Sequence, residues 1–471
     1  MDDMTDDMER RRRMTLWAHF AVIGLGAWLL ASPFQFGLFD ADSARLARDI
    51  GGERLLPPLA FRNLLTGIND LVCGLALMVF GALSLDPRLK WAQWAATIVG
   101  LWLLVAPLAF WTPSAAAYAS DTLVGGLAVA FSTLVPLMPG MAQAGMMDPN
   151  TVPPGWSYNP STWLQRLPIV ALGLVGFLIA RYLAAYQLGH VTAIWEPFFG
   201  TQFRENGTEH IITSKVSQAF PVADAGLGAV AYMLEMLMGL MGTPRRWRTM
   251  PWMVAFFFVL VVPLGAVSIG FIIIQPIMIG TYCTLCLIQA FAMLVMIPLT
   301  LDEVVAMAQF MGRTRRAGKP FWRSFLMGDA DPGDRPDANP GLGAPAGVQV
   351  RAALLGVTVP WTLAASCLVG VWLMASRAVV AVAPPLADSD HLTGALVVTV
   401  AVVAMADVAR ALRFVNGFLG LWLLAAPWVL GVGGSAAMWN DMAAGAVVIL
   451  LSLPRGRLSG HSAGGWDRWV F

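Results

Sequence analysis

The chain has 471 residues, of which 57% are hydrophobic and only 13% are charged. With a mean hydropathy of +0.66, this composition excludes an ordinary soluble domain and indicates an integral membrane protein. The formal net charge of +1 provides no basic surface for a polyanion, so nucleic acid is not expected as a partner.

Apolar runs follow one another along the whole chain. Stretches of about 18 to 24 largely uncharged residues, long enough to cross a hydrocarbon core of roughly 30 Å, occur about twelve times. The sequence therefore predicts an all-α integral membrane protein, in which a central four-helix bundle is flanked by two four-helix repeat modules. Stretches rich in Pro and Gly mark the boundaries. The predicted parts are an N-terminal repeat module (1–140), the central module (141–312), a cytoplasmic linker (313–349) and a C-terminal repeat module with its tail (350–471).

One pattern recurs in both flanking modules and defines the repeat. A predicted helix carries Gly-x-Trp, and the helix after it carries Asn-Asp or Ser-Asp, with Gly four residues beyond the Asp. We interpret the Asp and its neighbour as helix caps, the Gly as a point of close helix contact, and the Trp as a residue that anchors or packs near an interface. These segments resemble the SPW repeat family. The copies begin at Gly26, Gly100, Gly370 and Gly420, and their aspartates are Asp70, Asp121, Asp390 and Asp441.

Basic residues predict the orientation of the spans. If the N-terminus is cytoplasmic and the spans alternate, about 22 of the 30 Lys and Arg residues lie on the cytoplasmic side, which is the bias of the positive-inside rule. The sequence thus predicts a multi-pass protein of a bacterial-type inner (plasma) membrane, surrounded by membrane lipid, with both termini in the cytoplasm. The same alternation puts Gly280 and the residues just after it at the outer face.

A Cys-x-x-Cys pair stands at the head of the last predicted span of the central module, about residues 282–300. Cys283 and Cys286 are half of the four cysteines in the chain, and their spacing puts both on one face of a helix. The amides and dipole at a helix start favour a thiolate, and this spacing lets the pair close into a disulfide. On the outer face no cytosolic system keeps thiols reduced. The pattern therefore predicts a redox-active pair with Cys283 and Cys286 as catalytic residues.

The central module resembles the vitamin K epoxide reductase family. The resemblance rests on Cys283-Thr-Leu-Cys286, on the order of the helices and on the stretch SKVSQAFPVADAGLGAVAY at residues 214–232. It implies a four-helix bundle that holds a quinone beside the pair, with Cys286 facing the quinone and Cys283 exchanging with an incoming thiol. It also puts Ser214 at the position of a family serine and Ala290 at the position of a family tyrosine that binds the quinone.

The first outer loop of the central module, residues 189–218, contains no cysteine. Family members that relay electrons within one chain carry a second cysteine pair in this loop. The resemblance therefore implies a separate thioredoxin-like thiol partner on the outer face. Within the loop, the segment WEPFF at residues 195–199 is predicted to lie along the membrane interface.

Several other polar residues of the central module have more than one interpretation. Arg181 and Asp224 lie at similar depth on neighbouring spans and could form a structural ion pair or the wall of a polar pocket. Glu235 lies deeper, without a partner in the sequence, and could handle protons for a quinone. The loop residues His190 and His210 could complete a zinc site with the two cysteines, but their spacing is not that of a compact zinc motif, so no metal is predicted.

Two functions of different classes stay open on the sequence alone. One is a membrane thiol-disulfide/quinone oxidoreductase that uses an outward-facing Cys-x-x-Cys pair. The other is a non-catalytic membrane scaffold, or an accessory subunit of a larger membrane complex, whose central bundle keeps the pair without using it. Cycling of the pair between its oxidised and reduced forms distinguishes the two.

Overall fold

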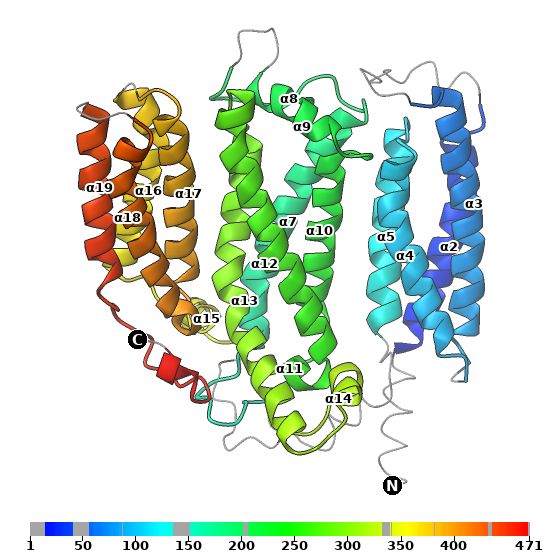
Figure 1. Cartoon of the computed structure of the whole chain (residues 1–471). Helices are drawn as coiled ribbons and strands as arrows, with labels where there is room; N and C mark the ends of the chain where they lie inside the picture. The colour runs from blue at the N-terminus through cyan, green and yellow to red at the C-terminus, as the bar shows by residue number, and fades with distance from the viewer. Residues whose placement is uncertain are drawn as a thin grey trace. The chain divides into compact units, whose positions relative to one another are not determined.

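The computed structural model describes residues 15–40, 56–86, 88–134, 151–200, 206–331, 340, 342–380, 382–431 and 436–469. The regular elements of these residues are helices (Figure 1), and their only strand-like pairings are isolated bridges. Nine helices within the described ranges are long and apolar enough to cross a membrane. The all-α membrane class is therefore confirmed, whereas the predicted count of about twelve spans is not confirmed.

The long helices form three consecutive sets along the chain. The first set is α2 (Trp17–Gln35), α3 (Leu59–Leu83), α4 (Trp91–Ala109) and α5 (Ala115–Leu134). The second is α7 (Trp163–Gln187), α10 (Asp224–Leu240), α12 (Pro251–Ile274) and α13 (Thr284–Arg316). The third is α16 (Trp361–Val379), α17 (Leu386–Val403), α18 (Arg413–Val429) and α19 (Ala436–Ser452). Short helices between them include α8 (Gly207–Ile212), α9 (Lys215–Gln218) and α11 (Arg246–Thr249).

The chain divides into two compact units. One consists of Met1–Met146, Gly173–Met241 and Thr281–Gln289, and the other of Met147–Leu172, Gly242–Gly280 and Ala290–Phe471. The helices α7 and α13 each contribute residues to both units. The module boundaries proposed from the sequence stay a prediction.

The two helices of each repeat hairpin cross at a pair of glycines. A Cβ added to Gly26 of α2 would lie 2.6 Å from the carbonyl oxygen of Gly74 in α3, which is closer than real Cβ contacts come. Such a close approach of two backbones is a common way of packing helices in a membrane. The interpretation of these glycines as contact points is therefore confirmed. The equivalent distances are 2.9 Å for Gly100 and Gly125, 2.6 Å for Gly370 and Gly394, and 2.8 Å for Gly420 and Gly445.

The repeat tryptophans join the two hairpins of a module through hydrogen bonds, and their predicted place near a membrane interface stays a prediction. The indole N–H of Trp102 in α4 donates a hydrogen bond of 2.7 Å to Oδ1 of Asn69 in α3. Asn69 directly precedes the repeat aspartate, so the Asn or Ser of the pattern is an acceptor between hairpins rather than a helix cap. An indole N–H that leaves water needs such an acceptor. The equivalent bonds are Trp28 to Ser120 (3.0 Å), Trp372 to Asn440 (2.8 Å) and Trp422 to Ser389 (3.0 Å).

The repeat aspartates meet in pairs, and the expectation that they cap helices is wrong. Asp70 and Asp121 are fully buried, and their carboxyl groups lie within hydrogen-bonding reach of each other. Asp390 and Asp441 repeat this arrangement in the third set of helices. Because α3 begins at Leu59, Asp70 lies about three turns inside its helix. Two ionised carboxylates at this distance in a low dielectric are costly, so we expect each pair to share a proton.

Candidate redox site at Cys283 and Cys286

Cys283 and Cys286 form a disulfide at the start of α13, with their Cα atoms 5.2 Å apart. The backbone N–H of Cys286 donates a hydrogen bond of 3.0 Å to Sγ of Cys283. When the disulfide is reduced, this helix-start amide favours a thiolate at Cys283. Cys283 is 0% exposed, whereas Cys286 is only partly buried. The residue expected to meet an incoming thiol is therefore the covered one in this state of the protein.

The loop that follows α7 covers Cys283. The Phe199 and Tyr282 rings lie 5.1 Å apart, and the N–H of Gly207 donates to the carbonyl oxygen of Phe199 at 2.7 Å. Gly207 also packs against the carbonyl oxygen of Tyr282, the residue before Cys283, at a distance that leaves no room for a Cβ. The loop is thus packed, through a glycine and two aromatic rings, against the residue that precedes Cys283.

Glu196 fastens this loop to the start of α13. Its carboxylate accepts hydrogen bonds from the N–H of Thr284 at 2.9 Å, from the Thr284 hydroxyl, and from the Thr208 hydroxyl at 2.5 Å. Burial alone would raise the pKa of Glu196, but the hydrogen bonds from Thr208 and Thr284 outweigh it and hold the pKa below its ordinary value of 4.5. This contact of Glu196 was not predicted from the sequence, in which Glu196 was only part of a predicted interfacial segment. The capping box formed by Asn206 and Glu209 marks the start of α8 and is the signal that could have indicated a folded loop.

The far end of the same loop is held by a polar cluster around Asp224. The Oδ1 atom of Asp224 accepts from Nε2 of Gln187 at 2.5 Å and from Oγ of Ser217 at 2.8 Å. Arg181 instead lies over the ring of Tyr118, with its guanidinium carbon 5.3 Å from the ring centre. The expected pair of Arg181 and Asp224 is therefore wrong, because neutral donors from the loop and from α7 satisfy the carboxylate.

Ser214, a predicted site residue, and His190, from the zinc alternative, both have local structural contacts. Ser214 precedes α9, and its hydroxyl accepts from the N–H of Ser217 at 3.4 Å, so it caps this short helix. His190 lies with Nε2 at 2.9 Å from the carbonyl oxygen of Thr112, and burial lowers its pKa from the ordinary value of 6.5. Across the described ranges, no three His, Cys, Asp or Glu side chains are grouped so that they could hold a metal ion.

A tyrosine that the sequence analysis did not single out lies one turn beyond the disulfide. The hydroxyl of Tyr232 in α10 donates to the carbonyl oxygen of Gln289 at 3.0 Å, and Nε2 of Gln289 donates to the carbonyl oxygen of Gly176 in α7 at 3.0 Å. A Cβ on Gly176 would overlap the Tyr232 ring, so this glycine makes room for the phenol. Ala290, the next residue of α13, is buried and has no polar side-chain group. The phenol here comes from α10. Tyr232 is the last residue of the stretch 214–232, which carries the family resemblance, and this position could have indicated it.

Glu235 lies one turn further along α10 than Tyr232, on the same side of the helix. It is 0% exposed, and in the described part of the chain neither carboxyl oxygen has a hydrogen-bond partner. An isolated carboxylate at this depth is costly, because neither water nor a cation compensates its charge. The neutral carboxylic acid, with a donor and an acceptor, is therefore the less costly form of this side chain.

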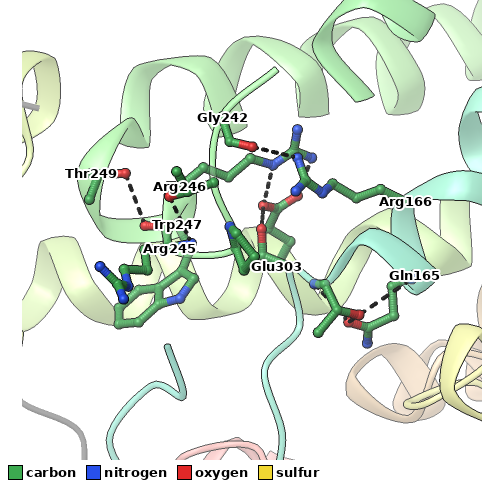
Figure 2. Close-up of polar contacts among 12 residues, drawn as sticks. Gln165, Arg166, Gly242, Arg245, Arg246, Trp247, Thr249 and Glu303 are labelled. Carbon is green, nitrogen blue, oxygen red and sulfur yellow. Dashed lines mark hydrogen bonds and ion pairs between the residues drawn. The ribbon is translucent and has the colours of Figure 1, made fainter. Parts of the chain in front are cut away.

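A second buried polar group belongs to the other compact unit, and its carboxylate is paired. Figure 2 shows Arg246, the first residue of α11, beside Glu303 of α13 and Arg166 of α7. Nε and an Nη of Arg246 donate to the two oxygens of Glu303, each at 2.6 Å. Ser161 donates to Glu303 at 2.5 Å, and Arg166 donates to the carbonyl oxygen of Gly242 at 3.1 Å. This group joins three chain segments and contains no reactive nucleophile.

A pocket of about 270 Å³ lies in the same unit as this cluster. Its walls include Tyr158, Asp302, Asp407 and the tail residues 458–463, and the Tyr158 hydroxyl donates to Asp302 at 2.5 Å. Neither Cys283 nor Cys286 lines it. Redox chemistry requires the sulfur atoms, so the cysteine pair and not this pocket is the candidate site.

Comparison with protein families agrees with both resemblances. Residues 167–301 match the Vitamin K epoxide reductase family, and residues 57–135 and 360–454 match the SPW repeat domain. Comparison with curated proteins and with solved structures yields no match. The first match includes the disulfide, Tyr232 and Glu235. The chain is therefore a multi-pass membrane protein that carries a vitamin K epoxide reductase family module between two SPW repeat regions.

Proposed function

We propose that the central module is a thiol oxidoreductase that takes electrons from a thioredoxin-like partner at the outer face of a bacterial-type inner membrane and delivers them to a membrane quinone. The observation that carries this proposal is the Cys283–Cys286 disulfide at the start of a membrane helix, within a match to a family of such enzymes. A buried structural disulfide needs no helix-start amide at its sulfur, whereas a pair that opens and closes benefits from one.

The first half of the reaction is thiol–disulfide exchange. A partner dithiol attacks the Cys283–Cys286 disulfide and passes two electrons and two protons to it, and its own cysteines leave as a disulfide. Attack at Cys283 requires the loop to move, because this sulfur is covered while the Glu196 contacts persist. The helix-start amide then stabilises the thiolate that forms at Cys283.

The residues around Cys286 fit a quinone. Cys286 is partly accessible, Tyr232 supplies a phenol one turn beyond it, and Glu235 supplies polar atoms that lack a partner in the described protein. A bound quinone would accept two electrons and two protons from the dithiol, and the disulfide would re-form. Ser214 and Ala290 stay predicted cofactor-binding positions by the family resemblance, while Ser214 also caps α9 and Ala290 is buried.

Alkylation trapping of Cys283 and Cys286 in cells tests this function. The pair is expected to become reduced when quinone supply is cut and to return to the disulfide when quinone is restored. A Cys286→Ser variant is expected to accumulate a mixed disulfide between Cys283 and its partner, which identifies the partner by mass. If the pair stays in one state under both conditions, the scaffold alternative is correct.

A further inference from the structure

Glu235 has an environment that packing alone does not explain. The side chain is fully buried, and its two carboxyl oxygens are without hydrogen-bond partners among the residues that the structure describes. Buried polar atoms in proteins are nearly always hydrogen-bonded, so each orphan needs an explanation. An apolar residue of similar volume would fill the same space without leaving polar atoms that lack hydrogen-bond partners.

The surroundings of Glu235 are apolar and uncharged. The titratable side chain that faces it from its own helix is Tyr232, one turn away, whose hydroxyl already donates to Gln289. On the neighbouring helix, Gly173 and Gly176 leave room beside Tyr232 and Met236. No cation that could neutralise a carboxylate acts on Glu235 from the described residues. The acid is therefore a buried hydrogen-bond donor without a partner among the described residues.

The position of Glu235 along α10 can be compared with the position of Cys286 along α13. Gln289 lies three residues beyond Cys286 on α13, and Glu235 lies three residues beyond Tyr232 on α10. At about 1.5 Å per residue, each step is roughly 4.5 Å along the axis. Tyr232 and Gln289 are bonded to each other, so Glu235 lies about two such steps further into the membrane than Cys286.

We propose that Glu235 is the hydrogen-bond donor that holds a carbonyl oxygen of the quinone. This inference rests on the proposed function. Ala290 has no side-chain donor for a quinone carbonyl oxygen. The proposal gives this role to Glu235 of α10 instead. A neutral acid suits this task, since it donates to a carbonyl oxygen and can accept from the hydroxyl of the reduced form.

Binding of decylubiquinone to the purified full-length protein with an intact disulfide tests the assignment. Glu235→Leu is expected to weaken binding about tenfold or more, because the donor is lost. Glu235→Gln keeps a donor of the same shape and is expected to bind within about threefold of the wild type. Asp121→Asn is the matched control, since Asp121 is equally buried in unit 1 but lies outside the match to the vitamin K epoxide reductase family, and it should leave the affinity unchanged.

Infrared difference spectra supply a readout that does not depend on activity. Addition of decylubiquinone is expected to shift the carbonyl band of a protonated carboxylic acid, and Glu235→Gln should remove this shift while Asp121→Asn retains it. Wild-type affinity in Glu235→Leu, or a shift that survives in Glu235→Gln, overturns the assignment. Such a result with a pair that still cycles leaves the proposed function intact, whereas a pair that never cycles refutes the proposed function by itself.

Discussion

Two glutamates of the central helices, one in α10 and one in α13, are almost equally buried, and their hydrogen-bond partners differ. Glu303 is 3% exposed and has bonds from Arg246 and Ser161 to its carboxylate, whereas Glu235 is 0% exposed and has no hydrogen-bond partner among the described residues. Burial therefore does not distinguish a structural acid from a functional one. The partners do, because a paired carboxylate stabilises the protein and an unpaired acid is available to a ligand.

The largest effect is expected when the paired glutamate is replaced. Glu303→Leu leaves Arg246 buried without a counter-charge, so the free energy of unfolding should fall by about 3–5 kcal/mol. Glu235→Leu removes an acid that has no partner, so it should change the free energy of unfolding by less than about 1 kcal/mol or raise it. Denaturant unfolding of the purified protein in detergent measures both.

A double variant sharpens this test. Arg246→Met combined with Glu303→Leu removes both charges and should recover most of the loss, since apolar replacements of buried ion pairs are often neutral. Equal losses in Glu303→Leu and Glu235→Leu would contradict the distinction between the two acids.

The aspartate pairs are an intermediate case, in which one acid is the partner of the other. Asp70→Asn keeps a group that can donate to Asp121, so the free energy of unfolding should fall by less than about 1 kcal/mol. Asp70→Ala leaves Asp121 buried without this partner and should cost about 1–3 kcal/mol. The same order is expected for Asp390→Asn and Asp390→Ala beside Asp441. If Asn is as damaging as Ala at either position, the pair does not share a proton.

The tryptophan bonds between hairpins should each contribute less than a carboxyl pair. Trp102→Phe keeps a large ring and removes the N–H that binds Asn69, so the expected loss is about 0.5–1.5 kcal/mol in the free energy of unfolding. Trp91→Phe in the same helix is the control, because Trp91 is 55% exposed and contacts Phe80 edge to face through its ring. A loss as large in Trp91→Phe would show that ring size and not the hydrogen bond matters.

The sequence predicted those features that depend on local patterns. Apolar runs indicated membrane helices, the four-residue spacing of Asp and Gly indicated close packing, and the spacing of Cys283 and Cys286 indicated a disulfide. Each of these signals lies within one or two helical turns. The residues involved are neighbours in space because they are neighbours in the chain.

Features that depend on contacts between distant segments could not be predicted in this way. Trp102 and Asn69 are 33 positions apart, and Glu196 and Thr284 are 88 positions apart, so no period in the sequence relates them. The capping interpretation of Asp70 was wrong for the same reason, since its partner Asp121 is on another hairpin.

Glu196 gives the smallest expected effect and extends the comparison to an acid at the protein surface. In a Cys286→Ser chain whose other two cysteines are alanine, Glu196→Gln should make Cys283 react about two- to tenfold faster with a pyridyl disulfide, because the loop opens more often. The pKa of Glu196 in the folded loop lies below 4.5, so the contribution of the carboxylate is complete above pH 4.5 and is lost as the pH falls through the folded value. The difference in rate between the two proteins should therefore shrink below pH 4.5. A difference that stays constant down to the acid limit of folding would mean that the side chain's shape, and not its charge, keeps the loop closed.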